Sequence, residues 1–551
     1  MMHTRRAVFL AATCSALLAL GSCKNSASKN ESRATGWSLN DKNSPLSHPK
    51  SSQAQKTGPG LVFVEGGSFV KGRVQDDIMR DWNNTPTQQH VQSFYMDETE
   101  VTNSMYLEFL EYIKAVYPPS NPKYDGIYQS ALPDTLVWRN RLSYNEDLVE
   151  NYLRHPAFAD FPVVGVSWLQ AQRFAQWRTN RVNELLLEEN GFLEKDARFK
   201  PLENEMVAFD TEAYLKNPNA AYGGAIDSLA RRATRDTIPS FAKLSDGVLL
   251  PAYRLPTETE WEYAAQAPGS QREFNNYKGR KKFPWEGNQT RDTDRRVLGD
   301  QLANFKKGKG DYGGIAGWSE DGGSVTTPVK MHPANDFGLY GMGGNVAEWV
   351  ADVYRPIIDS DYSDFNYYRG NVFQKAAIGK DGKVAVLQEG IEFDTLPNGK
   401  LSVKRLPGEV VKVPVGNEDT FMRFNYSESD NRNFNDGDLA SSRGYNRYNE
   451  ENTDKNRMYN APKPLVARDS TGGLILEYDK SNNRSSMITN DVRVYKGASW
   501  KDRAYWLDPA QRRYMPEYMS TDFIGFRCAM SYLGSKPKSL NRTPKSKTAK
   551  K

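Results

Sequence analysis

The sequence predicts a protein that mixes helices with short strands and joins them through long polar loops. Three observations support this prediction. Helix-capping signals recur along the chain, an alternating apolar run begins at Leu61, and the mean hydropathy is only −0.72 over 551 residues. The 38% hydrophobic content still allows a packed core. The length suits about two or three average domains, or one large domain with insertions.

Strand signals occur in two places. LVFV (61–64) alternates its apolar residues and predicts a strand, with Gly66-Gly67 as its turn. FDTLPNGKLSVKRL (393–406) predicts a hairpin, because Asn398-Gly399 favours a tight primed turn. This hairpin lies in an irregular polar block at 356–490. We expect the block to stay mobile or to order against a partner, since it can bury little apolar surface alone.

Three helices are predicted from their capping residues. Between the second and third, residues 192–250 are charged and lack clear periodicity. The helix signals are EVTN (100–103) ahead of MYLEFLEYIKAV with a stop at Pro118-Pro119, the Ser167–Gln170 capping box of a helix ending at Gly191, and the Thr257–Glu260 capping box.

The first 23 residues, MMHTRRAVFLAATCSALLALGSC, have the form of a bacterial lipoprotein signal. Basic residues precede an apolar run that is too short for a comfortable membrane span. Leu20-Gly21-Ser22-Cys23 then resembles a lipobox, which predicts removal of residues 1–22 and lipid on Cys23. A polar, flexible tether is expected over 23–60. The alternative is an ordinary signal peptide with a chance cysteine.

The distribution of charge and of cysteine along the chain limits the binding partners and the disulfides that can be expected. Residues 533–551 hold seven Lys or Arg and no acid, so the body of the chain is close to neutral and nucleic-acid binding is disfavoured. We expect this basic tail to be a disordered, solvated end. The alternative is docking on an acidic partner or anionic lipid. With Cys14 in the signal and Cys23 lipidated, Cys528 is left without a disulfide partner.

Six stretches in order then carry a family resemblance. They are LVFVEGGSFVKG (61–72), YMDETEVTNSMYLEF (95–109), PVVGVSWLQAQRFAQW (162–177), YRLPTETEWEYAAQA (253–267), FGLYGMGGNVAEWVAD (337–352) and RVYKGASW (493–500) followed by Gly525-Phe526-Arg527. Together they closely resemble the formylglycine-generating-enzyme (sulfatase-modifying factor) family. The resemblance implies an α+β fold related to C-type lectins, with little regular secondary structure and loops held by Trp and Gly. It places one such domain at 61–532, with insertions at about 178–250 and 356–490.

The resemblance also implies what the chain has lost. Enzymes of the family carry Gly-Gly-Ser-Trp-x-Cys-x-x-x-x-Cys, whose two thiols bind copper and oxidise a substrate cysteine, and soft thiolates suit Cu(I). Here Ser499 and Trp500 remain, but Asp502 and Leu507 stand at the thiol positions. We therefore expect a pseudo-active site with no catalytic residue or catalytic cofactor. The histidines offer no pair at ligand spacing for an iron site, and Cys528 is expected to be a small buried residue.

Structural calcium is a further implication of the resemblance. Calcium needs six to eight oxygen ligands. A position that often holds Asn or Asp in the family is Gly341 here, which weakens the second of two implied sites. If no calcium is bound, Asp321 is expected to be an acid of a surface loop and Glu348 a buried, hydrogen-bonded acid. The first site would use Asn304 and Asp321 with the carbonyls of Phe305 and Gly323, and the second the carbonyls of Gly344 and Val346 with the carboxylate of Glu348.

A narrower resemblance concerns inactive members on lipid anchors. RATGW (33–37) and the stretches 74–103 and 131–146 look like gliding-motility lipoproteins of Bacteroidetes. This resemblance implies an outer-membrane lipoprotein, facing the periplasm, in the gliding and type IX secretion machinery. Its expected partners are other subunits of that machinery, including the GldK-type ring lipoprotein, and the membrane through the lipid anchor. The expected role is a structural scaffold. The alternatives are a calcium-ordered module that binds glycans or peptides and a divergent cysteine-oxidising enzyme.

Overall fold

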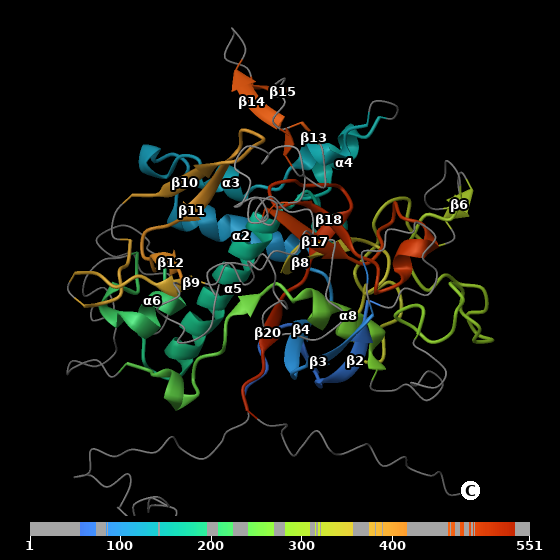
Figure 1. The fold of residues 1–551 in the computed structure, drawn as a ribbon, viewed down its shortest axis with the longest axis horizontal. Helices are drawn as coiled ribbons and strands as arrows, with labels where there is room; N and C mark the ends of the chain where they lie inside the picture. Colours follow the sequence, from blue (N-terminus) through green and yellow to red (C-terminus); the bar gives the residue numbers. More distant parts are fainter. Residues whose placement is uncertain are drawn as a thin grey trace, which may run out of the picture. The chain divides into compact units, whose positions relative to one another are not determined.

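Two four-stranded sheets form the framework of the computed structural model (Figure 1). The signal peptide, Cys23, nearly all of the tether and the tail, and the Asn-rich residues 431–460 lie outside the described residues. The structure describes residues 55–72, 84, 86–140, 144–194, 208–223, 241–268, 281–308, 314–315, 318–319, 321–355, 374–380, 382–387, 390–415, 461–462, 464–468, 474–478, 484–485, 489 and 491–534.

The first sheet has the strand order β18-β17-β8-β19. β17 is antiparallel to β18 and β8, whereas β19 runs parallel to β8. β8 is buried along nearly its whole length, as expected for a strand covered on both faces. Its register sets Glu348 opposite Lys496 and Trp349 opposite Tyr495, so two motifs far apart in the chain share one sheet. The strands are β18 (Arg513–Pro516), β17 (Val492–Lys496), β8 (Ala347–Val353) and β19 (Ile524–Phe526).

The second sheet confirms the predicted strand at 61–64 but not its turn. β1 pairs with β4, and the strand after Gly66 pairs instead with β3. A Cβ on Gly66 would lie 2.3 Å from the carbonyl oxygen of Val91, so glycine is needed here for close chain approach rather than for a hairpin. The sheet comprises β1 (Leu61–Val64), β4 (Phe94–Asp97), β20 (Ala529–Ser531) and β5 (Tyr253–Arg254), beside a separate pair of β2 (Gly67–Lys71) and β3 (Thr87–Val91).

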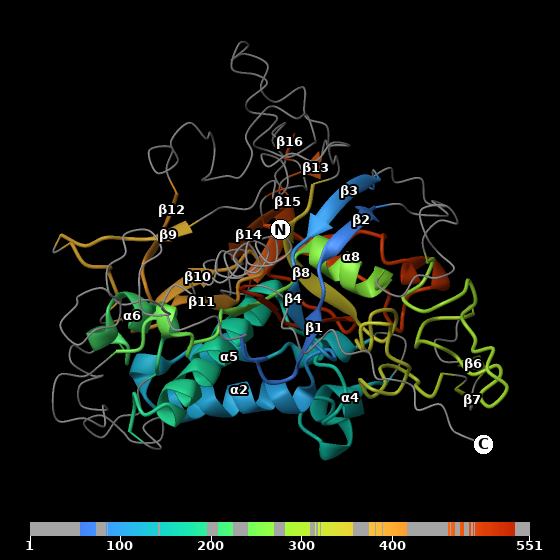
Figure 2. The same ribbon diagram turned by 90° about the horizontal axis from the view of Figure 1, so that it is seen from below.

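The three predicted helices are confirmed, and both predicted capping boxes form. α2 and α5 lie side by side (Figures 1 and 2). Tyr106 of α2 stacks on Phe174 of α5 with ring centroids 5.6 Å apart, and Phe174 packs edge-on against Phe526 of β19 at 5.4 Å. The helix pair is thereby attached to the first sheet. The helices are α2 (Asn103–Val116), α5 (Trp168–Glu189) and α8 (Glu258–Gln266).

Short elements make up the rest of the described chain, in keeping with an α+β fold of limited regular structure. Among the described residues, no helix is both long and apolar enough to cross a bilayer. These elements are η1 (Pro122–Tyr124), α3 (Ile127–Ala131), η2 (Thr135–Trp138), α4 (Glu146–Asn151), η3 (Pro156–Phe158), α6 (Thr211–Lys216), η5 (Pro218–Ala220), η6 (Leu244–Asp246), β6 (Gly314–Ile315), β7 (Trp318–Ser319), β9 (Gln374–Ala376), β10 (Glu392–Thr395), β11 (Leu401–Arg405), β12 (Lys412–Pro414), β13 (Ala461–Pro462), β14 (Pro464–Arg468), β15 (Leu474–Tyr478), β16 (Arg484–Ser485) and η11 (Ala504–Leu507).

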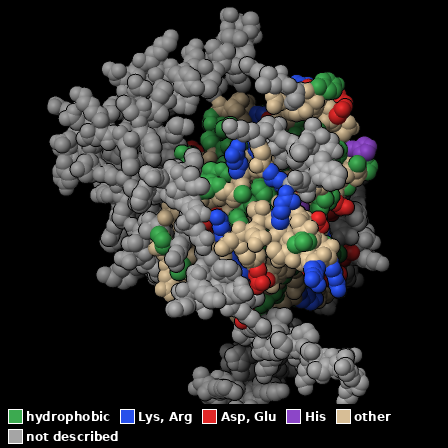
Figure 3. Space-filling model, turned by 90° about the vertical axis from the view of Figure 1, so that its right-hand side faces the viewer, with side chains coloured by type: hydrophobic (Ala, Val, Ile, Leu, Met, Phe, Trp, Pro, Cys, Tyr) green, Lys and Arg blue, Asp and Glu red, His purple; other side chains and the backbone are tan. Residues whose placement is uncertain are grey.

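The surface charges of the described residues are mixed. On the described part of the face seen in Figure 3, Lys and Arg side chains lie among apolar and acidic ones rather than forming one continuous basic field. A groove for nucleic acid requires such a field.

The predicted hairpin at 393–406 forms, but through a different turn. β10 and β11 pair antiparallel around Pro397-Asn398-Gly399. The Gly399 N–H donates to the Leu396 carbonyl at 2.8 Å, and only the glycine of this turn has a positive φ, of 78°. A two-residue primed turn needs positive φ at both central residues, so this is a three-residue loop, and proline at its first position explains the choice.

Residues 192–250, for which no pattern was evident, contain a small apolar cluster of their own. Its buried members surround Leu187 at the end of α5 and include Phe209, Tyr214 and Tyr222. No periodic pattern in the sequence signals this cluster, because its side chains come mostly from short turns rather than from one long helix.

Asp210 caps the short helix of this region. Its carboxylate accepts the Ala213 N–H at 2.7 Å and lies 3.3 Å from the Asn180 side-chain amide. Burial raises the pKa of Asp210 to about 6, and the nearby carboxylate of Glu409 adds to the rise. The folded protein therefore binds a proton here more tightly than the unfolded chain. Stability is lost as pH rises from about 4 through about 6.

Asp210→Asn is expected to remove this pH dependence while keeping the cap, because Asn and Asp cap helices about equally well. At pH 8 the variant should be more stable than the wild type by roughly 1–3 kcal/mol, with a much smaller difference at pH 4.5. Urea unfolding at pH 4.5 and at pH 8 measures the difference in the free energy of unfolding between the variant and the wild type. Asp246→Asn, at an exposed position, should leave the pH profile of the wild type in place. Equal profiles for Asp210→Asn and wild type would contradict the assignment.

Candidate functional site

The loop that follows β17 carries the pseudo-active site, and its first residue must be glycine. Gly497 has a φ of 78°, and a Cβ there would lie 3.1 Å from the ring of Trp261. Lys496, immediately before it, is fully buried and pairs with Glu262 at 3.1 Å. The loop is thus anchored at its start by packing and by a buried ion pair.

Asp502, at the first thiol position, organises the loop. One of its carboxylate oxygens accepts the Ser499 N–H at 2.8 Å and the Ser499 hydroxyl at 2.6 Å. The other accepts from Arg513 Nη1 at 2.7 Å, and Arg513 Nη2 donates to the Gly497 carbonyl at 2.6 Å. The structure therefore brings Ser499 and Asp502 together in a closed network, in which the carboxylate that accepts the serine hydroxyl is also paired with Arg513.

Leu507, at the second thiol position, belongs to an apolar cluster. Its side chain is fully buried with Phe283, Phe305 and Ala498. An aliphatic side chain in such a setting can neither bind a metal nor exchange electrons. Trp500 points elsewhere: its ring stacks on Trp138 at 6.0 Å, and its Nε1–H donates to the Asp522 carbonyl at 3.0 Å.

The first calcium set is gathered in the fold. Asn304 and Asp321 are both buried, and the Asn304 side-chain amide donates to the Val325 carbonyl at 2.7 Å. Lys307 Nζ lies 3.5 Å from the Asp321 carboxylate, so a lysine and a bound cation would share this carboxylate. Within the described ranges, no three His, Cys, Asp or Glu side chains come together. Oxygens from amides, carbonyls and water would have to complete a calcium shell, which partly fits Asn304, Phe305, Asp321 and Gly323.

The second calcium set does not fit a metal. The Glu348 carboxylate is fully buried and accepts from Arg527 Nε at 2.7 Å, from Arg527 Nη2 at 2.6 Å and from Trp261 Nε1 at 2.8 Å. Three N–H groups, two of them from one guanidinium that forms a bidentate pair, already donate to this carboxylate. The acid that would complete the set with the carbonyls of Gly344 and Val346 is therefore already engaged. The expectation of calcium here is not supported, because an internal cation occupies the acid.

Glu100 fills the space that a side chain at position 341 would need. A Cβ on Gly341 would lie 2.3 Å from Glu100 Oε1. Glu100 is fully buried, and its Oε1 accepts from the Asn345 side-chain amide at 3.2 Å. Burial raises the pKa of Glu100 to about 7, with Arg527 opposing and Glu348 adding to the rise. Glycine at 341 is therefore a structural requirement of this chain.

Cys528 is confirmed as a buried, inert thiol. Its side chain has no solvent exposure, and burial together with Asp97 raises its pKa to about 12. A thiol held protonated is a poor nucleophile and a poor ligand. The lipidation residue Cys23 lies outside the described residues.

Sequence reasoning missed three charged residues on which the site depends, namely Glu100, Arg513 and Arg527. Two of them stand inside quoted motifs, EVTN and Gly-Phe-Arg. For Arg527 the available signal was a charge within the apolar run IGFRCAM (524–530), since such charges are rarely buried without a partner. Arg513 has no such signal, because its partner Asp502 is defined only by the fold.

Comparison with known proteins finds a matching family and several relatives of this chain. The model of the sulfatase-modifying factor enzyme 1-like domain matches residues 47–388. The mouse (Mus musculus) formylglycine-generating enzyme is 38% identical over 99 residues, which cover 18% of this chain and 22% of that protein. The mouse inactive C-alpha-formylglycine-generating enzyme 2 is 38% identical over 104 residues, which cover 19% of this chain and 27% of that protein. The chain thus aligns with only about a quarter of the length of these relatives.

Solved structures give a weaker likeness. PvdO from Pseudomonas aeruginosa is 14% identical with a TM-score of 0.35, over 87% of this chain and all of that one. The family match, rather than this likeness, identifies the fold.

Asp502→Ala is expected to destabilise the protein by about 1–3 kcal/mol, because it leaves Arg513 and the Ser499 N–H without their acceptor. Denaturant unfolding measures the loss. Asp394→Ala is the control: it removes a carboxylate from an exposed pair with Lys404, and such a change should stay within about 0.5 kcal/mol. A neutral Asp502→Ala would refute the structural role of this residue.

Proposed function

Because the chain belongs to the sulfatase-modifying factor family, we propose that it is a non-catalytic member that acts as a binding scaffold. The observation that carries the proposal is that structural side chains occupy both redox positions. Asp502 is engaged by Ser499 and Arg513, and Leu507 is buried in an apolar cluster. Neither residue supplies the thiolate that copper chemistry requires. The divergent-enzyme alternative is disfavoured for the same reason.

Sequence resemblance supplies the proposed setting. We propose a GldJ-type lipoprotein, held by lipid on Cys23 in the outer membrane and facing the periplasm, in the gliding and type IX secretion machinery. The lipobox-like residues 20–23 and the stretches 33–37, 74–103 and 131–146 support this assignment. The proposed partners are other subunits of that machinery, including the GldK-type ring lipoprotein.

Residues 374–415 offer the scaffold additional surface. Arg173 on α5 pairs with Glu409 at 2.5 Å and donates to the Val403 carbonyl at 3.1 Å, which attaches the β10–β11 hairpin to the domain. Lys404 is exposed on the face of β11 opposite the buried Val403. A segment fixed at its base and exposed at its outer side is suited to contact another subunit.

A pull-down from native membranes in mild detergent tests the scaffold. Wild-type chain is expected to co-purify subunits of the motility and secretion machinery, and a variant without residues 533–551 asks whether the tail takes part. Ser499→Ala separates scaffold from enzyme: it removes the serine hydroxyl but keeps the Arg513–Asp502 pair. We expect Ser499→Ala to restore gliding and secretion in a deletion strain at wild-type protein levels. Lost function at normal levels would favour catalysis, and a chain without partners would refute the scaffold.

We also propose that the first calcium set binds a structural calcium ion. Asn304 and Asp321, with the carbonyls of Phe305 and Gly323, would hold it, and the ion would offset the buried charge of Asp321. The proposal rests on a buried acid and a buried amide in neighbouring loops, with Lys307 as a competitor.

Millimolar calcium is expected to raise the Tm of the wild type and a chelator to reverse the rise, because calcium binds the folded state alone. Asp321→Asn should abolish the shift. Glu286→Gln, at an exposed loop position, should retain it. If calcium leaves the Tm of the wild type unchanged, Lys307 alone neutralises Asp321 and the calcium proposal fails.

A further inference from the structure

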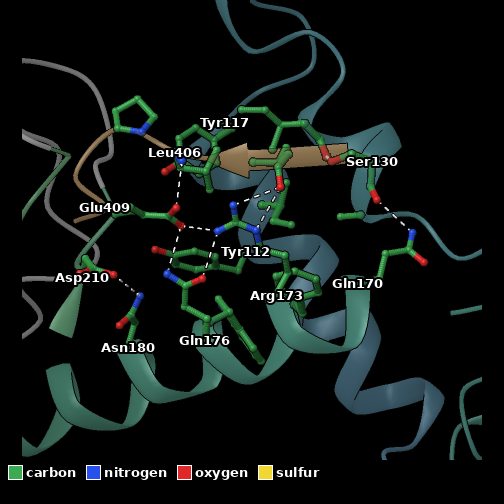
Figure 4. Close-up of a pocket in the computed structure, with 18 of the residues that line it drawn as sticks. Tyr112, Tyr117, Ser130, Gln170, Arg173, Gln176, Asn180, Asp210, Leu406 and Glu409 are labelled. Atoms are coloured by element: carbon green, nitrogen blue, oxygen red, sulfur yellow. Dashed lines mark hydrogen bonds and ion pairs between the residues drawn. The ribbon is translucent and has the colours of Figure 1, made fainter. Parts of the chain in front are cut away.

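A cavity of about 90 Å³ lies between α2, α5 and β11 (Figure 4). It is at the junction of the domain with residues 374–415, away from the pseudo-active-site loop. Its wall is largely apolar and includes Phe109, Ile113, Tyr117, Trp177, Val403 and Leu406. An apolar hollow with a few polar groups is the usual form of a binding site for a small apolar group.

Hydrogen bonds hold the cavity open in one geometry. Figure 4 shows Arg173 and Gln176 on α5 pointing toward Glu409. The Gln176 amide donates to Glu409 Oε1 at 3.2 Å, and the Leu406 N–H donates to Glu409 Oε2 at 3.1 Å. These polar groups therefore satisfy one another and keep the hairpin at a set distance from the helix. A preformed cavity binds its occupant without a further ordering cost.

The volume selects the size of the occupant. A cavity of about 150 Å³ takes a benzene ring of six carbons. A cavity of about 90 Å³ therefore suits roughly four carbons, which is the size of a leucine or isoleucine side chain. An indole or a sugar ring is too large for it.

Two buried donors in the wall select the chemistry next to that group. Among the residues that the structure describes, Trp177 Nε1 and Arg181 Nε have no hydrogen-bond acceptor, although both atoms are shielded from solvent. The remaining guanidinium nitrogens of Arg181 are engaged by Glu184 and by the Phe209 carbonyl. A buried N–H without an acceptor is costly, so an acceptor from an occupant would be favourable.

We propose that this cavity receives one branched aliphatic side chain of a partner protein, whose adjoining peptide carbonyl accepts from Trp177 Nε1 or Arg181 Nε. The inference rests on the proposed scaffold function and names an anchor point for its partner. The volume of the cavity determines the size of the aliphatic group, and the two buried N–H donors require an acceptor such as a carbonyl beside it. The preformed wall makes the site available without rearrangement.

N-acetyl-leucinamide is the probe, because it carries the side chain and the flanking carbonyls. In saturation-transfer difference NMR with the full lipoprotein, we expect saturable transfer to its methyl groups with an affinity roughly in the millimolar range. N-acetylglycinamide, which lacks the side chain, and N-acetyltryptophanamide, which is too large, should show no saturable transfer. Absence of saturable methyl transfer, or equal transfer for the three probes, would overturn the proposal without use of any variant.

Val403→Phe fills the cavity from β11, because Val403 lines the cavity and is buried, and should weaken N-acetyl-leucinamide binding by about tenfold or more. Lys404→Phe adds the same ring at an exposed position on the opposite face of the same strand and should bind like the wild type. Thermal unfolding confirms that both variants are folded. Unchanged binding by a folded Val403→Phe would overturn the site.

The same variants in the membrane pull-down separate the two proposals. Loss of a partner subunit with Val403→Phe, but not with Lys404→Phe, supports the anchor. Retention of every partner by a variant that no longer binds the probe overturns the anchor and leaves the scaffold standing. A wild-type chain that binds the probe but captures no subunit refutes the scaffold, and with it the partner named for this cavity.

Discussion

The buried pair of Glu348 and Arg527 joins the two sheets to each other and to helix α8. Both side chains have no solvent exposure. Glu348 lies on β8 and accepts from Trp261 of α8, while Arg527, between β19 and β20, also donates to the carbonyls of Asp97 and Tyr340. Removing one member of such a pair leaves an unpaired buried charge and costs about 3–5 kcal/mol. The position of the pseudo-active-site loop follows from this pair, because β17 takes its register from β8.

The same pair engages the acid of the second calcium set. A carboxylate that already receives three hydrogen bonds has little to offer calcium, and Glu100 occupies the space that a side chain at position 341 would need. In the loop after β17, Asp502 pairs with Arg513 and holds Ser499, while Leu507 packs among apolar side chains. Charge and packing therefore supply the constraints that fix this loop.

The segment at 374–415 adds a surface region to this frame. Arg173 and Glu409 join it to α5, and the hollow that remains between them is largely apolar. In the scaffold that we propose, contact with another chain would fall on this region rather than on the loop after β17.

Local signals in the sequence determined the helices. Thr102, Ser167 and Thr257 cap α2, α5 and α8 as predicted, because a cap is decided within about four residues. The ordered motifs likewise identified the family, and the burial of Cys528 was expected from the sequence.

Only the tertiary structure decided the pairings. In the fold, β2 pairs with β3 rather than with β1, and the β10–β11 hairpin turns at Pro397-Asn398-Gly399. The fold also places Glu100 against Gly341 and Arg513 against Asp502. The Arg527–Asp97 contact spans 430 residues of sequence. No local pattern encodes such a distance, since the partners meet only after the sheets have formed, and the buried charges are tolerated only because they meet.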